Sequence, residues 1–371
     1  KMFKWFFQNN DAKLDLQTQI DMLKQDVARL ELIISQNQEA NTLALSQLQS
    51  ELALTISRQN EMEQILNELT NQSEYYGYGA NTIIENPRTI EVTNLNNSGA
   101  GSLRDALLQS GSRLIDVKVS GTINLTDNIY VTNGNLILKG NGIHITGGMT
   151  QLEASNIIFS NAKIKGSGSG ADCLSITAWS GKHVENIVLD HLDLSQANDE
   201  NLDIRGNGSI NNVTVQHCKV TDHTKAMLLE GKIDKVSILY NHFVNNDERN
   251  VRIKNVSENQ LSVEMINNVF EGFRSATRIS LGSKFSIVNN TFLPRSNNPS
   301  STIIDGENDT ETGGNHSWTY GYVSGNTIPE GFNLIGSNLN NYIHQQPYAP
   351  LTVTPKTDYK DWVIANAGFK N

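Results

Sequence analysis

The chain has 371 residues, of which 18% are charged, and a formal net charge of −10 at pH 7. A chain of this length can bury a sizeable core in one large domain or two smaller ones. Its net negative charge disfavours a nucleic-acid partner, because such partners are held mainly by cations that neutralise phosphates. An acidic polymer would be repelled as well, unless a local group of cations or a bound metal reverses the field.

Several simple signals are missing from the sequence. The two cysteines, Cys173 and Cys218, have neither zinc-site nor disulfide-framework spacing, so we expect buried thiols. No apolar run approaches the ~18 residues of a membrane span. Residues 1–10, KMFKWFFQNN, lack a small-residue cleavage site and predict a short apolar tip rather than a signal peptide.

Residues 11–72 show the period of a coiled coil. Steps of four and three join the apolar positions of the first run, with a positions at Ile20, Val27 and Ile34 and d positions at Leu16, Leu23 and Leu30. Asn37 and Asn41 continue this seam, and a second run from Leu45 to Leu69 resumes it after a stutter near residues 41–56. A self-associating stalk is predicted, and isoleucine at a with leucine at d favours a dimer. The alternative is a long amphipathic helix packed on its own domain.

Residues 78–371 change to a β pattern with a repeat. An apolar triplet opens each frame at residues 157, 187, 213, 236, 263 and 285, so the frames are separated by 30, 26, 23, 27 and 22 residues. Position +4 is occupied by Asn161, His191, His217, Tyr240, Asn267 and Asn289, and position +7 by Ile164, Leu194, Val220, Phe243, Phe270 and Phe292. One strand cluster per period predicts a parallel β-helix, whereas a propeller blade needs about 40 to 50 residues. We expect an inward-facing, left-handed corner at +4, with structural roles for the two histidines.

Charged residues gather at similar positions of successive frames. Asp172, Asp199, Asp203, Lys225, Arg249 and Arg252 fall at offsets between +12 and +16 of four frames. Equal offsets lie one above another at about 4.8 Å per coil, so these side chains are predicted to line one groove. Each of them taken alone is more often a solvated surface residue.

The groove suits removal of a proton alpha to a uronate carboxylate. Asp172, Asp199 and Asp203 could hold Ca²⁺, which would neutralise the sugar carboxylate and acidify the neighbouring C5 hydrogen. Lysine and arginine would stabilise the enolate-like intermediate, and the glycan would break by β-elimination. Arg274 and Arg278 extend the groove and could bind further sugars, or could be solvated. Trp179 could be a sugar-stacking platform or a loop cap.

At these residues the sequence resembles the pectate lyases of polysaccharide lyase family 1, over about residues 88–293. The resemblance is found in four segments: IEVTNLNNSGAGSLRDALLQSGSRLIDVKVSGTINL (90–125), VLDHLDLS (188–195), ANDENLDIRGNGSINNVTVQHCKVTDHTKAMLLEG (197–231) and NHFVNNDERNVRIK (241–254). The resemblance implies an all-β, right-handed parallel β-helix of the pectate-lyase type, here preceded by an α-helical coiled coil.

The same resemblance implies roles for individual residues. It makes Arg249 the proton acceptor, with Lys225, Arg252 and Lys254 as its catalytic neighbours. Val251 stands where the family's RxPxxR segment has proline, and Lys254 stands for its last arginine, which loses the bidentate fork. Gly170 stands where many relatives carry a further calcium aspartate, and Glu264 matches a downstream histidine.

A β-helix on a coiled coil also resembles a virus tail spike, which favours a trimer and leaves a dimer open. The sequence therefore predicts an extracellular lyase on a virion tail, with an acidic polysaccharide as its substrate and no nucleic-acid partner. A tail spike or adhesin of the same fold that binds glycan without cleaving it is the first alternative. A secreted bacterial enzyme is the second.

Overall fold

The computed structural model describes residues 10–36, 42–70, 75–166, 172–255, 262–296, 302–307 and 316–370. The chain divides into two compact units, residues 1–74 and residues 75–371. The predicted apolar tip lies in residues 1–9, outside the described residues, apart from Asn10, which opens the first helix. Among the described helices, none is long and apolar enough to cross a membrane.

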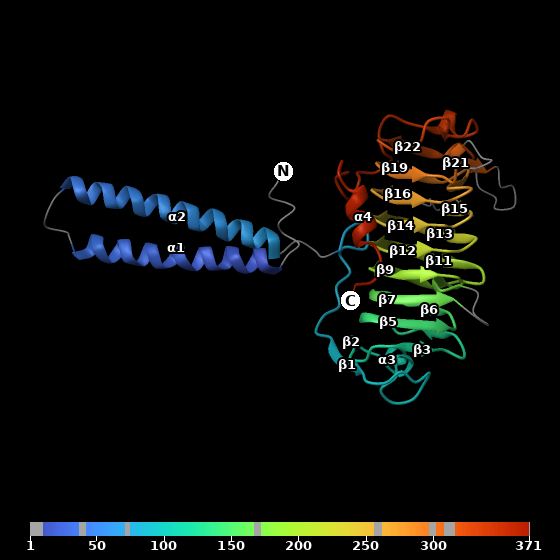
Figure 1. Ribbon diagram of the computed structural model, residues 1–371, viewed down its shortest axis with the longest axis horizontal. Helices are drawn as coiled ribbons and strands as arrows, with labels where there is room; N and C mark the ends of the chain where they lie inside the picture. The colour runs from blue at the N-terminus through green and yellow to red at the C-terminus, as the bar shows by residue number, and fades with distance from the viewer. Residues whose placement is uncertain are drawn as a thin grey trace. The chain divides into compact units, whose positions relative to one another are not determined.

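The first unit contains two helices, α1 (Asn10–Gln36) and α2 (Thr42–Thr70), which lie side by side and antiparallel (Figure 1). The predicted seam of α1 is its least exposed face: Ile20 is buried, and Leu23, Val27, Leu30 and Ile34 are half-buried. The apolar spacing therefore identified the packed face of α1.

The prediction of one continuous coiled coil over residues 11–72 is not confirmed. Residues 37–41, including both seam asparagines, lie outside the described residues, and α1 packs on α2 of the same chain. On α2, Leu48 and Leu52 are half-buried as predicted, but Ile56 is 37% exposed and Thr55 is less exposed than it. The heptad pattern records which face of a helix is buried, and it does not say whether the covering helix belongs to the same chain.

The second unit is a parallel β-helix whose strands form three stacks, and all strand pairings within its described residues are parallel. The first stack contains β1 (Arg88–Val92), β2 (Arg113–Val117), β5 (Leu136–Gly147), β7 (Ile157–Gly166), β9 (His183–Asp190), β11 (Glu200–Gln216), β13 (Lys225–Leu239), β16 (Ser262–Ile266), β19 (Lys284–Val288) and β22 (Tyr320–Ser324). The second adds β3 (Thr122–Asn124), β10 (Asp193–Ser195), β12 (Lys219–Thr221), β14 (His242–Val244), β17 (Val269–Glu271) and β20 (Thr291–Leu293).

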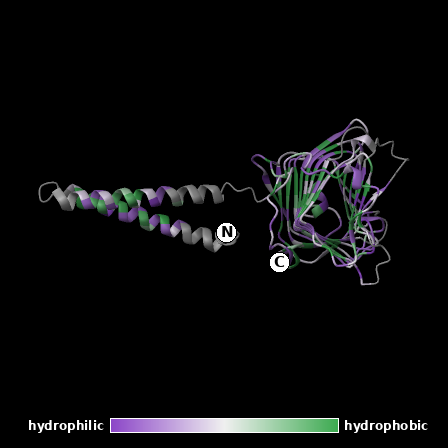
Figure 2. Ribbon diagram, turned by 90° about the horizontal axis from the view of Figure 1, so that it is seen from above, coloured by the Kyte–Doolittle hydropathy of each residue, from purple (hydrophilic) through white to green (hydrophobic). Residues whose placement is uncertain are grey.

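The third stack begins with β4 (Ile129–Val131), β6 (Thr150–Leu152) and β8 (Leu174–Ala178), and it continues through the first halves of β11 and β13. It ends with β15 (Val251–Asn255), β18 (Thr277–Ser280), β21 (Thr302–Glu307) and β23 (Asn333–Ile335). Seen along the coil axis, hydrophobic residues line the interior (Figure 2). One apolar core therefore runs through the coils, as the repeat predicts.

The two repeat positions predicted from the sequence are confirmed. All six +4 residues have positive φ, between 51° at His191 and 58° at Asn267, so each makes a left-handed corner. All six +7 residues are buried, and the Phe243, Phe270 and Phe292 rings stack at centroid distances of 4.7 and 4.8 Å. The frame read from the sequence is therefore the structural frame.

The inward position of this corner is +5, not +4 as predicted. Asn241, Asn268, Asn290 and Asn326 form a ladder in which each Nδ2 donates to the next Oδ1 at 2.9–3.0 Å. The Oδ1 atoms of the last three also accept the backbone N–H of the preceding asparagine in the ladder, for example Asn241 N at 2.9 Å from Asn268 Oδ1. The left-handed turn directs residue +4 outward, so its neighbour enters the core and needs these bonds there.

The ends of the β-helix are covered by short elements. Helix α3 (Leu103–Leu108), capped by Ser102, packs near β1 and β4. Towards the other end lie two short helices, η3 (His316–Trp318) and η4 (Asn340–Tyr342). The C-terminal segment, with helix α4 (Lys360–Asn366), then runs back along the left-handed corner, where Gly368 N donates to His217 O at 2.8 Å. The described residues after 293 thus supply final coils and a cover.

We expect Asn268→Ala to lower the free energy of unfolding by about 2–4 kcal/mol, because it leaves several buried polar partners in the ladder without bonds. Urea denaturation followed by circular dichroism measures this. Asn341→Ala, at an exposed position, is the matched control and should change stability by less than about 0.5 kcal/mol. Equal effects of the two substitutions would show that the ladder is not a stabilising element.

Candidate active site

The third stack carries residues that the sequence predicts to line a groove. Register places Asp203, Leu228, Arg252, Arg278 and Asp305 directly above one another. A second column begins at Glu200, earlier in β11 than Asp203, and in it Glu200 is paired with Lys225 and Lys225 with Glu248. Equal offsets in the sequence are displaced by one or two residues between neighbouring coils of the first four frames, because the coils differ in length. These residues nevertheless lie on one side of the β-helix.

An acidic group lies where β11 begins. Single carboxylate oxygens of Asp172, Asp199 and Glu200 all lie within 4.8 Å of one another. Asp172 and Glu200 are buried, and the Glu200 backbone N–H donates to Asp172 Oδ1 at 3.1 Å. Burial raises the pKa of Asp172, against the lowering effect of that hydrogen bond. Three carboxylates are thus gathered at one point by two successive coils.

Asp203, the third predicted metal ligand, is buried beside this group. Its side chain is 1% exposed, and within the described part of the chain neither of its oxygens accepts a hydrogen bond. Arg205 Nε lies 3.0 Å from Asp203 Oδ2. Burial, followed by the charge of Asp172, raises the pKa of Asp203 to about 8. A buried carboxylate with so few partners is one that a cation would stabilise.

Glu200 is the site residue that the sequence reasoning missed. Its side chain is 1% exposed and forms an ion pair with Arg249. Burial, followed by the charge of Asp199, raises the pKa of Glu200 to about 7. One signal could have found it: Glu200 has the same +13 offset as Arg249, next to an aspartate already assigned to the site.

The two cations nearest the acidic group are Lys225 and Arg249. Lys225 Nζ donates to Asp199 Oδ1, and burial of Asp199 opposes but does not cancel the lowering of its pKa by this bond. Arg249 has φ of 52°, a left-handed conformation that costs a residue other than glycine about 1–2 kcal/mol. Strained backbone is often found at functional sites, where it fixes the direction of a side chain.

The other predicted cations each have an acidic partner. Arg252 Nη2 and Arg278 Nη1 share Glu307, at 2.8 and 3.1 Å from its two oxygens. Lys254 Nζ lies 3.1 Å from Glu230 Oε1. Arg274 Nη2 is 2.9 Å from Asp247 and 3.2 Å from Glu248. Cation–carboxylate pairs therefore recur along this side of the β-helix.

Three residues lie apart from the acidic group. Trp179 is 54% exposed and follows β8, whose Ala178 pairs with Gly206 in the middle of β11, away from Glu200 at its start. His191 and His217 lie at the left-handed corner, where their Nδ1 atoms are 2.7 and 3.0 Å from Asp190. Their predicted structural role agrees with this position.

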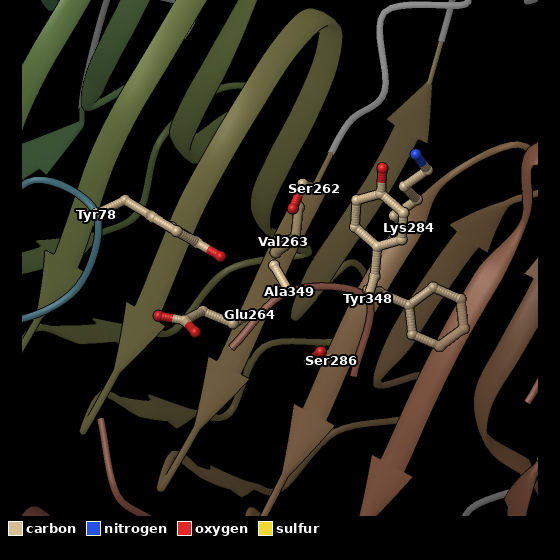
Figure 3. Close-up of a pocket in the computed structure, with 9 residues that line it drawn as sticks. Tyr78, Ser262, Val263, Glu264, Lys284, Ser286, Tyr348 and Ala349 are labelled. Atoms are coloured by element: carbon tan, nitrogen blue, oxygen red, sulfur yellow. The ribbon is translucent and has the colours of Figure 1, made fainter. Parts of the chain in front are cut away.

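Glu264, which matches the downstream histidine of the family, is not in the groove. It belongs to β16 in the first stack and accepts a hydrogen bond from Ser237 Oγ at 2.6 Å. It lines a small pocket with Tyr78, Lys284 and Tyr348, in which Lys284 Nζ lies 3.6 Å from the Tyr348 ring centroid (Figure 3). Its strand lies on a different face, so the match in sequence does not carry a role at the groove.

Calcium fits the acidic group on chemical grounds. Calcium binds oxygen ligands at 2.3–2.6 Å. Two oxygens that bind the same ion therefore lie within roughly 5 Å of each other. Asp172, Asp199 and Glu200 meet that spacing, and Asp203 supplies a buried carboxylate that lacks hydrogen bonds among the described residues. Gly170, which replaces a further aspartate of the family, lies outside the described residues.

The fold belongs to the class of right-handed parallel β-helices, as solved structures show. Jun a 1, the major allergen from cedar pollen, superposes with a TM-score of 0.61 at 18% identity, covering 81% of this chain and 96% of the allergen. A pectate lyase from Bacillus sp. N165 in complex with trigalacturonate gives a TM-score of 0.58 at 20% identity, covering 80% and 98%. The β-helix is therefore pectate-lyase-like.

Sequence comparison leads to the same kind of protein. The "Probable pectate lyase C" of Aspergillus oryzae is 34% identical over 194 residues, 49% of this chain and 44% of that protein. The "Probable pectate lyase P56" of Solanum lycopersicum is 29% identical over 173 residues, 38% of this chain and 42% of that protein. The chain thus spans less than half the length of these curated relatives. No family model matches the chain.

The raised pKa of Asp203 predicts how stability depends on pH without calcium. An unfolded aspartate ionises near pH 3.9, whereas folded Asp203 keeps its proton to about pH 8. The folded state therefore gains stability from protonated Asp203; this contribution is complete below about pH 4 and is lost as the pH rises to about 8. In chelator, we expect Asp203→Asn to unfold with a larger free energy than wild type at pH 8, by on the order of a few kcal/mol.

This advantage of Asp203→Asn should shrink as the pH falls towards 4, and urea denaturation at several pH values measures it. Asp305→Asn, at an exposed carboxylate in the same column, is the control and should show a smaller pH dependence. A stability difference that grows on acidification would contradict the assignment.

Proposed function

We propose that this chain is a polysaccharide lyase that cleaves a uronate-containing glycan by β-elimination with Ca²⁺. The observation that carries the proposal is the acidic group of Asp172, Asp199 and Glu200 with Lys225 and Arg249 at its edge, on a pectate-lyase-like β-helix. Cation-binding carboxylates directly beside fixed positive side chains suit a substrate that carries its own carboxylates.

The residues of the chain divide the work of such a reaction. Bound calcium would neutralise the uronate carboxylate, which makes the hydrogen on the adjacent C5 more acidic. Arg249, held at the edge of the acidic group by its left-handed backbone, would take that proton. Arginine is normally protonated at neutral pH, so this role depends on the resemblance to pectate lyases.

Other side chains would stabilise charge and hold the glycan. Lys225, one coil from Glu200, would interact with the negative charge that develops on the substrate. Arg252 and Lys254 project from the same strand as neighbours of Arg249. Arg274 and Arg278, in the next coil, would bind further sugar units, and the exposed Trp179 would stack on a sugar at the far end of the strands.

A second function is a tail spike or adhesin that binds glycan without cleaving it. The observation that favours it is the pairing of every predicted groove cation with a carboxylate of the chain. A substrate carboxylate would have to displace these partners. Catalysis requires that at least Arg249 be available to substrate, so activity measurements separate the two functions.

The place of action is proposed to be extracellular, as a virion tail spike or as a secreted enzyme. The helical unit supports self-association, because apolar side chains remain exposed on both helices: Met22 at 53%, Leu32 at 56% and Leu54 at 53%. A second or third copy would cover them, and a trimer is favoured by the resemblance to tail spikes. The partner outside the chain itself would be an acidic polysaccharide.

We expect incubation with polygalacturonate, alginate or host capsule to give an unsaturated product that absorbs ultraviolet light, and a calcium chelator to abolish it. Arg249→Ala should lower kcat by about 10²- to 10⁴-fold while glycan binding changes only a few fold, because a proton acceptor acts only in the transition state. Arg88→Ala, at an exposed arginine of β1, is the matched control. Retained binding without product from any acidic glycan would refute the lyase.

Self-association is tested by placing charges on the exposed apolar positions. Leu32→Lys with Leu54→Lys should raise the dissociation constant on the order of 10²-fold, since each buried leucine contributes about 1.5–3 kcal/mol. Analytical ultracentrifugation measures the mass and distinguishes a dimer from a trimer. Gln25→Lys, at an exposed polar position of α1, should leave association unchanged. A wild-type chain that is monomeric at all concentrations would show that the helical unit does not mediate self-association.

A further inference from the structure

Glu200 lies between a group of carboxylates and a cation of the chain. On one side, its carboxylate lies within 4.8 Å of the ligand oxygens of Asp172 and Asp199. On the other, it forms an ion pair with Arg249 Nη1. The side chain is 1% exposed, so water does not offer an alternative partner, and the bond from its backbone N–H to Asp172 fixes the main chain.

The ion pair holds Arg249 back from its own coil. Register pairs Glu200 with Lys225 and Lys225 with Glu248, the residue before Arg249, so the pair spans two coil spacings, about 10 Å. The guanidinium is thus drawn back towards the acidic group, past the coil of Lys225. In this arrangement the guanidinium is paired with Glu200 and is not available to a substrate.

We propose that Glu200 couples calcium binding to the release of Arg249. When a cation draws the Glu200 oxygen into its shell, the carboxylate loses charge available to the guanidinium, and the ion itself repels Arg249. Arg249 then leaves the pair and extends over the groove. Glu200 is a positioning residue in this scheme, and the scheme rests on the calcium site of the proposed function.

The neighbouring ion pairs differ from the pair of Glu200 with Arg249, which spans two coils. Lys225 pairs with Asp199 and Arg205 with Asp203, each bonded to a residue of its own or the adjacent coil. Arg252 and Arg278 are bonded to Glu307, away from the acidic group. Calcium is therefore expected to change the surroundings of Arg249 and to leave Arg252 and Arg278 unchanged.

The first test uses the wild-type chain without glycan. Arginine modification by phenylglyoxal, quantified by peptide mass spectrometry, should increase at Arg249 several fold when calcium replaces chelator. Arg252 and Arg278 serve as internal controls and should be modified equally in both conditions. Arg249 modification that is unchanged or lowered by calcium would overturn the proposal.

The second test is a double-mutant cycle on calcium affinity, measured by isothermal titration calorimetry. Arg249→Met should raise the affinity about tenfold in wild type and less than about twofold in the Glu200→Gln background, because the competition exists only when Glu200 is charged. Arg205→Met, beside Asp203, is the matched control, and its effect should be equal in both backgrounds.

The outcomes separate the proposals. Calcium binding with equal effects of Arg249→Met in both backgrounds would refute the coupling and leave the calcium site intact. No calcium binding by the wild-type chain would refute both the coupling and the calcium part of the proposed function. Urea denaturation of each variant confirms that it is folded, and the phenylglyoxal experiment needs no variant.

Discussion

The hydrogen-bonded register between successive coils is the constraint on which the rest of the β-helix depends. Each strand pairs in parallel with the strand one coil away, so a side chain is placed by its position within the coil and repeats at the spacing of neighbouring strands. The phenylalanine stack, the asparagine ladder and the groove are three results of this one rule. A one-residue shift in pairing would break all three together.

The same register gathers like charges, which gives the candidate active site its character. Stacked coils bring Asp172 next to Asp199 and Glu200, and burial then raises the pKa of Glu200 to about 7 and that of Asp203 to about 8. Buried carboxylates destabilise a fold unless a cation or a proton compensates them. This destabilising cost falls at the point where a cation is proposed to bind, and perturbed pKa values of this kind are typical of functional sites.

The pairing of groove cations gives the site a second property. Lys225, Arg249, Arg252 and Lys254 are all positive, yet each is bonded to a carboxylate within reach. This arrangement reconciles a net charge of −10 with a surface proposed to bind an acidic glycan, because the local charges balance before any cation is added. Attraction of the glycan would then depend on the cation, and so would the exposure of Arg249.

The sequence by itself determined the parallel β-helix, the left-handed corner at +4, the apolar column at +7 and the side of the coil on which the charges lie. These features are local and repeat with the coil, so periodicity records them. Only the tertiary structure placed Glu200 in the site, moved the inward asparagines to +5, put Glu264 on another face and paired α1 with α2 of the same chain. Coil lengths vary between 22 and 30 residues, so exact register is set by hydrogen bonds between coils. The offset that Glu200 shares with Arg249, 49 residues later, does not by itself show that the two side chains form an ion pair.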